Sequence, residues 1–187
     1  MELPDVRRRV RQGRRLALAR ACDARPGLRV HDALAGWGTD GLVLAALGCR
    51  VHLSERNAEV HRILDSRLRA ESLARARPDF ISWEHEDARD RWRSGGDFDV
   101  VYLDPMFGKH PKTALPGKQM QILANLVGEM SAGEIAELIG QARRVAGSRV
   151  VVKRRARTEA IGRPAWQIRA RSVRFDVYLP VSRCSSA

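Results

Sequence analysis

The stretch LRVHDALAGWGTDGLVLAALG, residues 28–48, connects a short apolar run to a compact helical run through a glycine-rich turn. Residues 28–34 have the composition of a strand. Thr39–Leu47 is rich in alanine and leucine, and Gly48 follows it at the position that typically ends a helix. The turn GWGTDG (36–41) matches the spacing G-x-G-x-x-G, which lets a ligand lie against the backbone at a helix N-terminus. This stretch predicts the first strand and helix of an α/β sheet.

The same alternation of strands and helices continues along the chain. The predicted strands are 50–54, 80–85, 98–103 and 149–153, and the predicted helices are 58–70, 118–126 and one that begins at the capping box Ser131-x-x-Glu134. Strands that alternate with helices imply crossover connections and a parallel sheet. Two closely spaced final strands, 166–170 and 174–179, predict an antiparallel addition. We therefore expect a Rossmann-like α/β fold with a mostly parallel central sheet, an antiparallel C-terminal strand and helices on both faces.

Length and charge limit the possible roles of the protein. The 187 residues suit a single domain, 1–187, that begins with a basic helix or extension over residues 1–26, helical from 7 to 24. Lysine and arginine number 34 against 22 acids, which gives a net charge of +12, and six arginines lie in RRRVRQGRR (7–15). The guanidinium group of arginine binds phosphate bidentately, so this excess of arginine predicts a polyanionic partner. The alternative is that arginine replaces lysine in a GC-rich genome and the charge only keeps the protein in solution.

Several classes of protein are disfavoured. The longest run without a charged residue is ten residues, Gln119–Gly128, whereas a membrane-spanning helix needs roughly 18. The arginine-rich N-terminus is not followed by an apolar segment with a cleavage signal, which disfavours secretion. Three widely spaced cysteines favour a reducing compartment, and no His/Cys/Asp spacing indicates a metal. We expect a cytoplasmic protein, monomeric and without a metal, in which His31 is a packed or hydrogen-bonded histidine.

The glycine turn is shared by proteins that bind NAD or FAD and by proteins that bind S-adenosylmethionine (SAM). Asp32 ends the first strand, where an acid suits the cationic amino group of a methionine tail better than a pyrophosphate. Asp40 opens the helix, where it would repel the phosphates of a dinucleotide. Glu55 ends the second strand and can accept hydrogen bonds from ribose hydroxyls. Asp87 follows the third strand, where it either meets the adenine amino group or is a solvated turn acid. Asp32 and Asp40 favour SAM, whereas an acid such as Glu55 is found in both classes.

The stretch VVYLDPMFGKH, residues 100–110, ends the fourth strand with an acid. In an open α/β sheet, ligands bind beyond the carboxyl ends of the strands. An exocyclic amine is a poor nucleophile because its lone pair is delocalised into the base. Asp104 and the main-chain carbonyl of Pro105 can accept its two N–H groups, Phe107 can stack on the base, and Asp104 or water can take the released proton. The alternative is a proline turn after a strand, but four strand ends that carry matching chemistry favour catalysis.

These segments together resemble a known family. VVYLDPMF with its basic tail, DALAGWGTDGLVLAALGCRVHLSERN upstream and RVVVKR downstream are similar to the bacterial small-subunit ribosomal RNA methyltransferase J family, over about residues 7–179. The resemblance implies a class I SAM-dependent methyltransferase that methylates the N2 amine of a guanosine in small-subunit ribosomal RNA. It places the cofactor at Thr39, Asp40, Glu55, Arg56, Asp87, Ala88 and Asp104, and the chemistry of the turn adds Asp32, Gly36 and Gly38.

Basic residues near the predicted site indicate where RNA would bind. Lys153 and Arg154 end the fifth strand at the same edge as Asp104, and Lys109 and Lys112 lie on the segment after the DPMF motif. We expect these four cations to contact RNA phosphates.

Two departures from the family pattern bear on the target. Relatives generally carry several dozen further residues before the basic helix, and Gly108 stands where they often have proline. Three other functions stay open: methylation of another planar amine (adenine, cytosine or a protein glutamine), a non-catalytic RNA-binding or ribosome-assembly module, and an NAD-dependent oxidoreductase. The last leaves both the DPMF motif and the net charge of +12 without an explanation.

Overall fold

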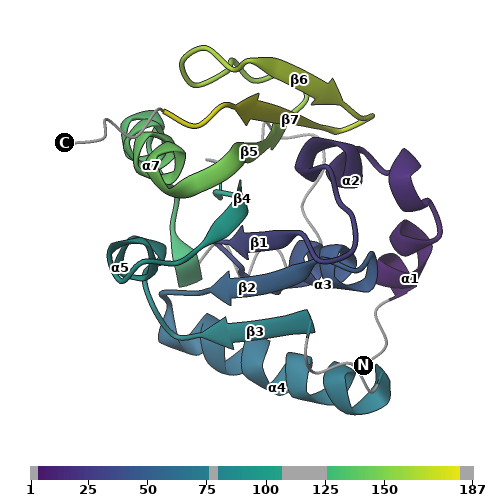
Figure 1. Ribbon diagram of the computed structural model, residues 1–187. Coiled ribbons are helices and arrows are strands. Elements are labelled where there is room, and N and C mark those ends of the chain that lie inside the picture. The colour runs from purple at the N-terminus through teal and green to yellow at the C-terminus, as the bar shows by residue number, and fades with distance from the viewer. Residues whose placement is uncertain (1–3, 76–79, 107–125, 182–187) are drawn as a thin grey trace.

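Seven strands form one sheet in the computed structural model, which describes residues 4–75, 80–106 and 126–181 (Figure 1). Their order across the sheet is β3-β2-β1-β4-β5-β7-β6. They are β1 (Arg29–Asp32), β2 (Arg50–Ser54), β3 (Ile81–Glu84), β4 (Phe98–Leu103), β5 (Ala146–Arg155), β6 (Trp166–Arg169) and β7 (Val173–Tyr178). The neighbouring strands from β3 to β5 pair in parallel. The order of the strands reverses between β1 and β4, which is where α/β sheets form a ligand crevice.

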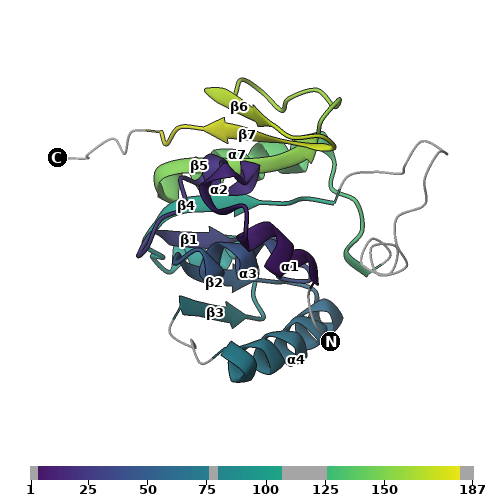
Figure 2. The same ribbon diagram turned by 90° about the vertical axis from the view of Figure 1, so that its right-hand side faces the viewer.

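The C-terminal strands confirm the predicted antiparallel addition. β7 pairs antiparallel with both β5 and β6, so β6 runs in the same direction as β5. The hairpin between β6 and β7 therefore lies at the edge where the parallel strands end. Figure 2 shows this pair at one end of the sheet.

Helices cover both faces of the sheet, as predicted (Figure 1). On one face, α2 (Ala17–Cys22), α3 (Thr39–Ala46) and α4 (Ala58–Arg75) contribute to a core cluster with the side chains of β1, β2 and β4. On the other face, α5 (Ala88–Arg93) and α7 (Ala132–Val145) form a second cluster with β4 and β5. Apolar residues on both faces of the central strands explain their nearly continuous hydrophobic runs.

The N-terminal segment differs from the single helix predicted over residues 7–24. It forms α1 (Pro4–Val10), the 3-10 turn η1 (Gly13–Arg15) and α2. Gly13 has a φ of +53°, a conformation that glycine adopts without strain and that interrupts an α-helix. The break lets α1 pack against α3 while α2 packs against β5, β6 and β7.

Other element boundaries follow the sequence closely, with three differences. α4 extends beyond the predicted residue 70 to Arg75, and the six-residue α5 was missed. The capping box predicted at Ser131 is present, but β5 begins at Ala146, directly after α7. The predicted helix 118–126 lies almost entirely outside the described residues. Within the described ranges, no helix combines the length and the apolar character that crossing a membrane requires.

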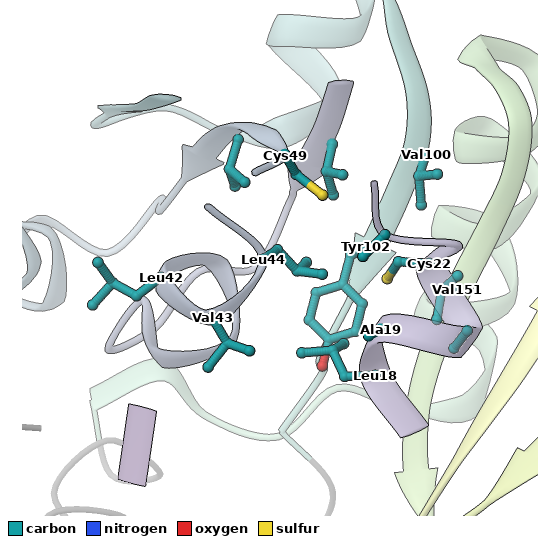
Figure 3. Packing of buried hydrophobic residues seen from close by; sticks show 14 of the residues in the cluster. Leu18, Ala19, Cys22, Leu42, Val43, Leu44, Cys49, Val100, Tyr102 and Val151 are labelled. Carbon is teal, nitrogen blue, oxygen red and sulfur yellow. The ribbon is translucent and has the colours of Figure 1, made fainter. Parts of the chain in front are cut away.

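The core on the α2–α3 face surrounds Tyr102 of β4. Figure 3 shows its ring between Leu44 of α3 and Leu18, Ala19 and Cys22 of α2. The ring is fully buried, yet its hydroxyl reaches the N-terminal turn of α3 and donates a hydrogen bond to Asp40. Burial of this one side chain thus fixes α3 relative to the carboxyl end of β4, where the predicted site begins.

Candidate active site

A cavity of about 600 Å³ opens at the edge where β1, β2, β4 and β5 end. Its size is within the range typical of small-molecule sites. Nine of the ten residues predicted to hold a cofactor line it: Asp32, Gly36, Thr39, Asp40, Glu55, Arg56, Asp87, Ala88 and Asp104. Pro105 and Lys153 line it too, whereas Phe107, Lys109 and Lys112 lie outside the described residues. Residues far apart in the sequence therefore meet in one cavity.

The glycine turn after β1 depends on its glycines for a close approach to α4. Gly38 has a φ of +67°, and a Cβ atom there would lie 2.6 Å from Cδ1 of Leu64. Gly38 is the one predicted cofactor residue that does not line the cavity, since its role is to let the turn pack tightly. Gly36 has a φ of +52°, and its N–H donates to Oε2 of Glu55 over 2.9 Å. The turn is thereby tied to the end of β2.

Glu55 is held in a fixed orientation at the end of β2. It is buried, and its Oε1 accepts a hydrogen bond from the N–H of Asn57 over 2.8 Å. Each carboxylate oxygen has two acceptor positions, so one position remains on each oxygen after these backbone contacts. Because Glu55 lines the cavity, the remaining positions suit a pair of ribose hydroxyls.

A cluster of charged side chains joins four elements at the base of the cavity. Nζ of Lys153 lies 2.7 Å from Oδ2 of Asp104 and 2.9 Å from Oδ2 of Asp40. Arg9 of α1 places Nη2 2.6 Å from Oδ1 of Asp40, and the hydroxyl of Tyr102 donates to Oδ2 of Asp40 over 2.5 Å. The last residue pair of β4 and β5, Leu103 with Val152, puts Asp104 and Lys153 side by side one residue further on.

Burial and charge act in opposite directions on the pKa values of this cluster. Burial favours the neutral form of Asp40, but Lys153 and Arg9 overcome it and hold the pKa of Asp40 below its usual range. For Asp104, burial outweighs the attraction of Lys153, and the pKa is raised. Burial disfavours the charge on Lys153, yet Asp104 and Asp40 raise its pKa above the usual value. Lys153 is therefore a cation, and Asp104 is a carboxylate suited to accepting a proton.

Asp32 lines the cavity and makes no ion pair with a described residue. It is 2% exposed, and its Oδ1 accepts no hydrogen bond from the described residues. Burial, together with the nearby Asp40 and Asp104, raises its pKa. A cation brought beside Asp32 favours its ionised form, and the ammonium group of SAM is such a cation, so the chemistry of this residue fits SAM.

Lys153 and Arg154 both make contacts within the protein, and contact of either residue with RNA phosphates stays a prediction. The ammonium group of Lys153 is engaged by two carboxylates. Arg154, on the opposite side of β5, is 9% exposed, and its Nη2 donates to the carbonyl of Glu159 over 3.0 Å. Lys153 thus lines the cavity, whereas Arg154 is buried on the other side of β5.

Asp87 has a structural role that limits its contact with a cofactor. It is the N-cap of α5, and its Oδ1 accepts from both the backbone N–H and Nε of Arg89, while its Oδ2 accepts from Nη2. One acceptor position therefore remains, on Oδ2. The buried Ala88 follows it at the wall of the cavity. An adenine contact at these two residues stays a prediction.

A second polar network, on the α5 face, was not predicted. Trp92 donates to Nδ1 of His31 over 2.8 Å, so the proton of His31 is on Nε2, which donates to Ser54 over 2.7 Å. Ser54 donates to Oε1 of Glu86, which is also 2.8 Å from Nε2 of His52. His31 is thus a packed, hydrogen-bonded histidine, as expected.

Three side chains of this network, His31, His52 and Glu86, bring potential metal ligands within 4.8 Å of one another. A metal on Nε2 of His31 would move the imidazole proton to Nδ1, directly against the N–H that Trp92 donates. The hydrogen bonds therefore favour a structural network at this position, and we assign it no metal.

The His31 network predicts a pH dependence of stability. Burial, with His52 and Arg91 nearby, lowers the pKa of His31 to about 3. The unfolded chain thus binds a proton below about pH 6.5 that the folded chain excludes, so this stabilisation is complete above that pH and is lost as the pH falls. Between pH 6.5 and 4, the free energy of unfolding should fall by up to about 1.4 kcal/mol per pH unit, and less steeply in His31→Gln. Urea denaturation at several pH values measures both slopes, and equal slopes would contradict this role.

Several residues of the site gave no signal in the sequence. Arg9 is one of six arginines in a basic run, and only the docking of α1 on α3 selects it. Met130, Glu134 and Gln141 line the cavity from α7 and its N-terminal end. The capping box predicted this helix, but sequence periodicity does not show which of its polar residues face a cavity.

The glycine turn before α3, the buried Glu55 after β2 and Asp104 after β4, on a sheet of this order, are typical of a class I SAM-dependent methyltransferase. A family model described as a putative SAM-dependent methyltransferase matches residues 3–180. The chain belongs to this family and, within it, to the ribosomal RNA small subunit methyltransferase J family.

The membership rests on curated relatives and on a solved structure. Ribosomal RNA small subunit methyltransferase J of Laribacter hongkongensis is 42% identical over 173 residues, which cover 84% of this chain and 58% of the relative. The protein of the same name from Photobacterium profundum is 37% identical, and the match covers 92% of this chain and 72% of the relative. A SAM-dependent methyltransferase from Neisseria gonorrhoeae, whose crystal structure is known, is 34% identical with a TM-score of 0.69. The match covers 90% of this chain and 72% of that one.

The fold alone is shared more widely. A magnesium protoporphyrin IX methyltransferase from Synechocystis, solved with bound SAM, has a TM-score of 0.58 at 16% identity. The chain spans 66% of the length of the relative from Desulfotalea psychrophila, at 36% identity, and 58% of the one from Laribacter hongkongensis. It thus corresponds to about two thirds of the curated relatives that it matches.

Proposed function

We propose that this chain transfers a methyl group from SAM to the N2 amine of a guanosine in small-subunit ribosomal RNA. The observation that carries the proposal is the setting of Asp104. Lys153 holds its Oδ2, while its Oδ1 accepts no hydrogen bond from the described residues and the side chain lines the cavity. The names of the relatives, ribosomal RNA small subunit methyltransferase J, support the substrate. Such a substrate would place the protein in the cytoplasm.

The cavity supports one arrangement of the cofactor. Asp32, with an unpartnered carboxylate oxygen, would receive the ammonium group of the methionine tail, and Glu55 would receive the ribose hydroxyls. Thr39 and Arg56 also line the space between these two acids and would complete the binding site. When bound, SAM supplies an electrophilic methyl group on its sulfonium.

Asp104 and Pro105 would orient the amine that attacks. Oδ1 of Asp104 and the carbonyl of Pro105 accept its two N–H groups, which directs the nitrogen lone pair toward the methyl. After attack, one proton leaves the nitrogen. Asp104, whose pKa is raised by burial, can accept this proton, and water beside it can carry it away. Lys153 and Asp40 do not touch the amine but keep Asp104 in place.

Stacking of the base on Phe107 and phosphate contacts by Lys109 and Lys112 stay predictions, because these residues lie outside the described ranges. Base stacking by Phe107 together with proton acceptance by Asp104 would give the DPMF motif a role in both placement and chemistry.

The function is tested with methyl-labelled SAM and small ribosomal subunits from cells that lack such a methyltransferase, followed by nucleoside analysis. Label in N2-methylguanosine at one position is the expected result. Label in adenosine, cytidine or a protein glutamine would establish another planar amine as the substrate. SAM binding without any transfer to subunits or naked RNA would instead indicate a non-catalytic module, and binding of NAD without SAM an oxidoreductase.

Glu55→Ala should weaken the binding of S-adenosylhomocysteine by about 10–100-fold, since hydrogen bonds to a buried carboxylate contribute roughly 1.5–3 kcal/mol. Isothermal titration calorimetry measures this affinity without any need for turnover. Glu84→Ala is the matched control because Glu84 is an exposed acid at the end of the neighbouring strand β3. An affinity in Glu55→Ala equal to that of Glu84→Ala would remove Glu55 from the cofactor site.

A further inference from the structure

The β6–β7 hairpin lies at the edge of the sheet that holds Asp104. Arg169 of β6 pairs with Arg174 of β7, which pairs in turn with Arg154 of β5. Arg154 is the residue directly after Lys153, so Arg169 is level with the charged cluster of the cavity. The N–H of Ala156 donates to the carbonyl of Ser172 over 3.2 Å, which joins the loop after β5 to the turn of the hairpin. This loop and hairpin form a continuous rim.

Four arginines of the loop and hairpin are exposed, and three of them lie near the edge where β5 and β6 end: Arg157 just after β5, Arg169 at the end of β6 and Arg171 in the hairpin turn. The fourth, Arg163, lies near the start of β6. None of Arg157, Arg169 and Arg171 makes a side-chain hydrogen bond or ion pair with a described residue. The acid within the hairpin, Asp176, is fully buried against Arg174 and cannot offset them. The exposed acid of the rim is Glu159, so the rim keeps a positive charge.

Further exposed arginines lie around the cavity. Arg56 follows β2 and lines the cavity, and Arg8 lies on α1, the helix whose Asp5 and Arg9 line its wall. Figure 2 shows α1 beside α3, below the β6–β7 pair. Arg8 is ion-paired with Asp5, and the exposed acids Glu134 and Glu137 line the cavity from α7. Of the described arginines around the cavity, those exposed without such a partner are therefore Arg56 and those of the rim.

An arginine row beside a site for a nucleobase has the chemistry of a phosphate-binding surface. Guanidinium groups bind phosphate bidentately, and phosphate contacts fix the register of a nucleic acid without reading its sequence. An acidic protein surface could also meet such a rim, but the Asp104 site needs one nucleotide held in place, which requires its neighbouring phosphates to be fixed.

We propose that Arg157, Arg169 and Arg171 bind phosphates of the RNA strand on either side of the target nucleotide. The proposal rests on the proposed function. It assigns to these three arginines the phosphate contacts for which the sequence had indicated Lys153 and Arg154. The rim binds the backbone, and the Asp104 site receives the base.

The experiment compares two triple variants of the full chain with equal loss of charge. The rim variant carries Arg157→Ala, Arg169→Ala and Arg171→Ala. The control carries Arg50→Ala, Arg93→Ala and Arg144→Ala at the opposite edge, where β2 begins and α5 and α7 end. All six arginines are exposed. Fluorescence anisotropy measures the affinity for a transcript of small-subunit ribosomal RNA between 50 and 300 mM KCl.

The rim variant should bind the transcript roughly tenfold more weakly near 0.1 M salt, and the slope of log K against log salt should fall by about two to three units. The control should lose less than about threefold and keep the slope. Affinity for S-adenosylhomocysteine should be unchanged in both variants, which shows that the cofactor site is folded. A rim variant with the slope of the wild type would overturn the proposal.

The same experiment distinguishes a failure of the rim from a failure of the proposed function. If the wild type methylates RNA and the rim variant binds RNA as the control does, the rim is wrong and the function stands. If the wild type itself shows no salt-dependent affinity for RNA, both the rim and the RNA substrate are wrong. If the control loses as much affinity as the rim variant, binding depends on net charge alone, and the rim is again overturned.

Discussion

Asp104→Ala should lower kcat for methyl transfer to RNA by about 10²–10⁴-fold, the range expected when a group that orients and deprotonates the nucleophile is lost. The affinity for SAM should fall by less than about tenfold, because we propose that Asp32 and Glu55 provide the other cofactor contacts. Single-turnover measurements at saturating SAM and RNA isolate the chemical step from product release. The expected signature is thus a large change in rate with a small change in cofactor affinity.

Asp104→Asn separates the two roles of this side chain. The amide oxygen can still accept one N–H from the amine, but the neutral side chain cannot take the proton. A rate for Asp104→Asn close to that of Asp104→Ala would assign most of the effect to charge and proton acceptance, and an intermediate rate would assign part of it to orientation. Asp90→Asn, at an exposed position of α5, is the control. Turnover of Asp104→Ala within threefold of that control would refute the mechanism.

Lys153→Met should lower the free energy of unfolding at pH 7 by about 3 kcal/mol, because it leaves two carboxylates in a buried site with one cation fewer. The loss should shrink in acid. In the wild type, the low pKa of Asp40 stabilises the fold above about pH 4, and this stabilisation is lost as the pH falls. The variant lacks the lysine that lowers this pKa, so it has less of this stabilisation to lose. Without Lys153 the pKa of Asp104 should rise further, so protonation should stabilise the variant as the pH decreases.

Chemical denaturation at pH 7 and pH 4 measures both effects, and a second substitution checks the cause. The double variant Lys153→Met with Asp40→Asn should be more stable than Lys153→Met alone, because one of the stranded charges is removed. Strict additivity of the two losses would show that Lys153 and Asp40 do not interact. A loss of the same size at both pH values would mean that packing of the lysine stem, not its charge, stabilises the fold.

The sequence predicted most of the sheet because its strands are short apolar runs between strong turn signals. Residues 50–54 and 98–103 are strands with the predicted bounds. The N-terminal helix was predicted as one piece because Gly13 alone marks its break, and a lone glycine does not always end a helix. Helix α5 was missed because it has only six residues, most of them charged, and so shows no periodic pattern of apolar residues.

The residues that line the cavity were predictable because the strand ends of a parallel sheet meet at one edge. The contacts of Lys153 with Asp104 and Asp40 were not predictable, although the register of β4 and β5 explains why Lys153 lies beside Asp104. A lysine at a strand end resembles a phosphate ligand until the neighbouring strand is known to supply an acid at the same level. The contact of Arg9 with Asp40 depends on how α1 docks, and periodicity carries no information about that.

The charged cluster also has a consequence for how the protein folds. Arg9, Asp40, Asp104 and Lys153 are spread over most of the chain, and contacts between such distant residues form slowly because long loops must close first. During synthesis, Asp40 and Asp104 leave the ribosome before the lysine that neutralises them. The core around Tyr102 can begin to form from earlier segments, whereas the cavity acquires its final charge balance only when β5 has joined the sheet. Assembly of the active site is thus a late event, and a chain arrested before Lys153 would carry the acids of the site without this cation.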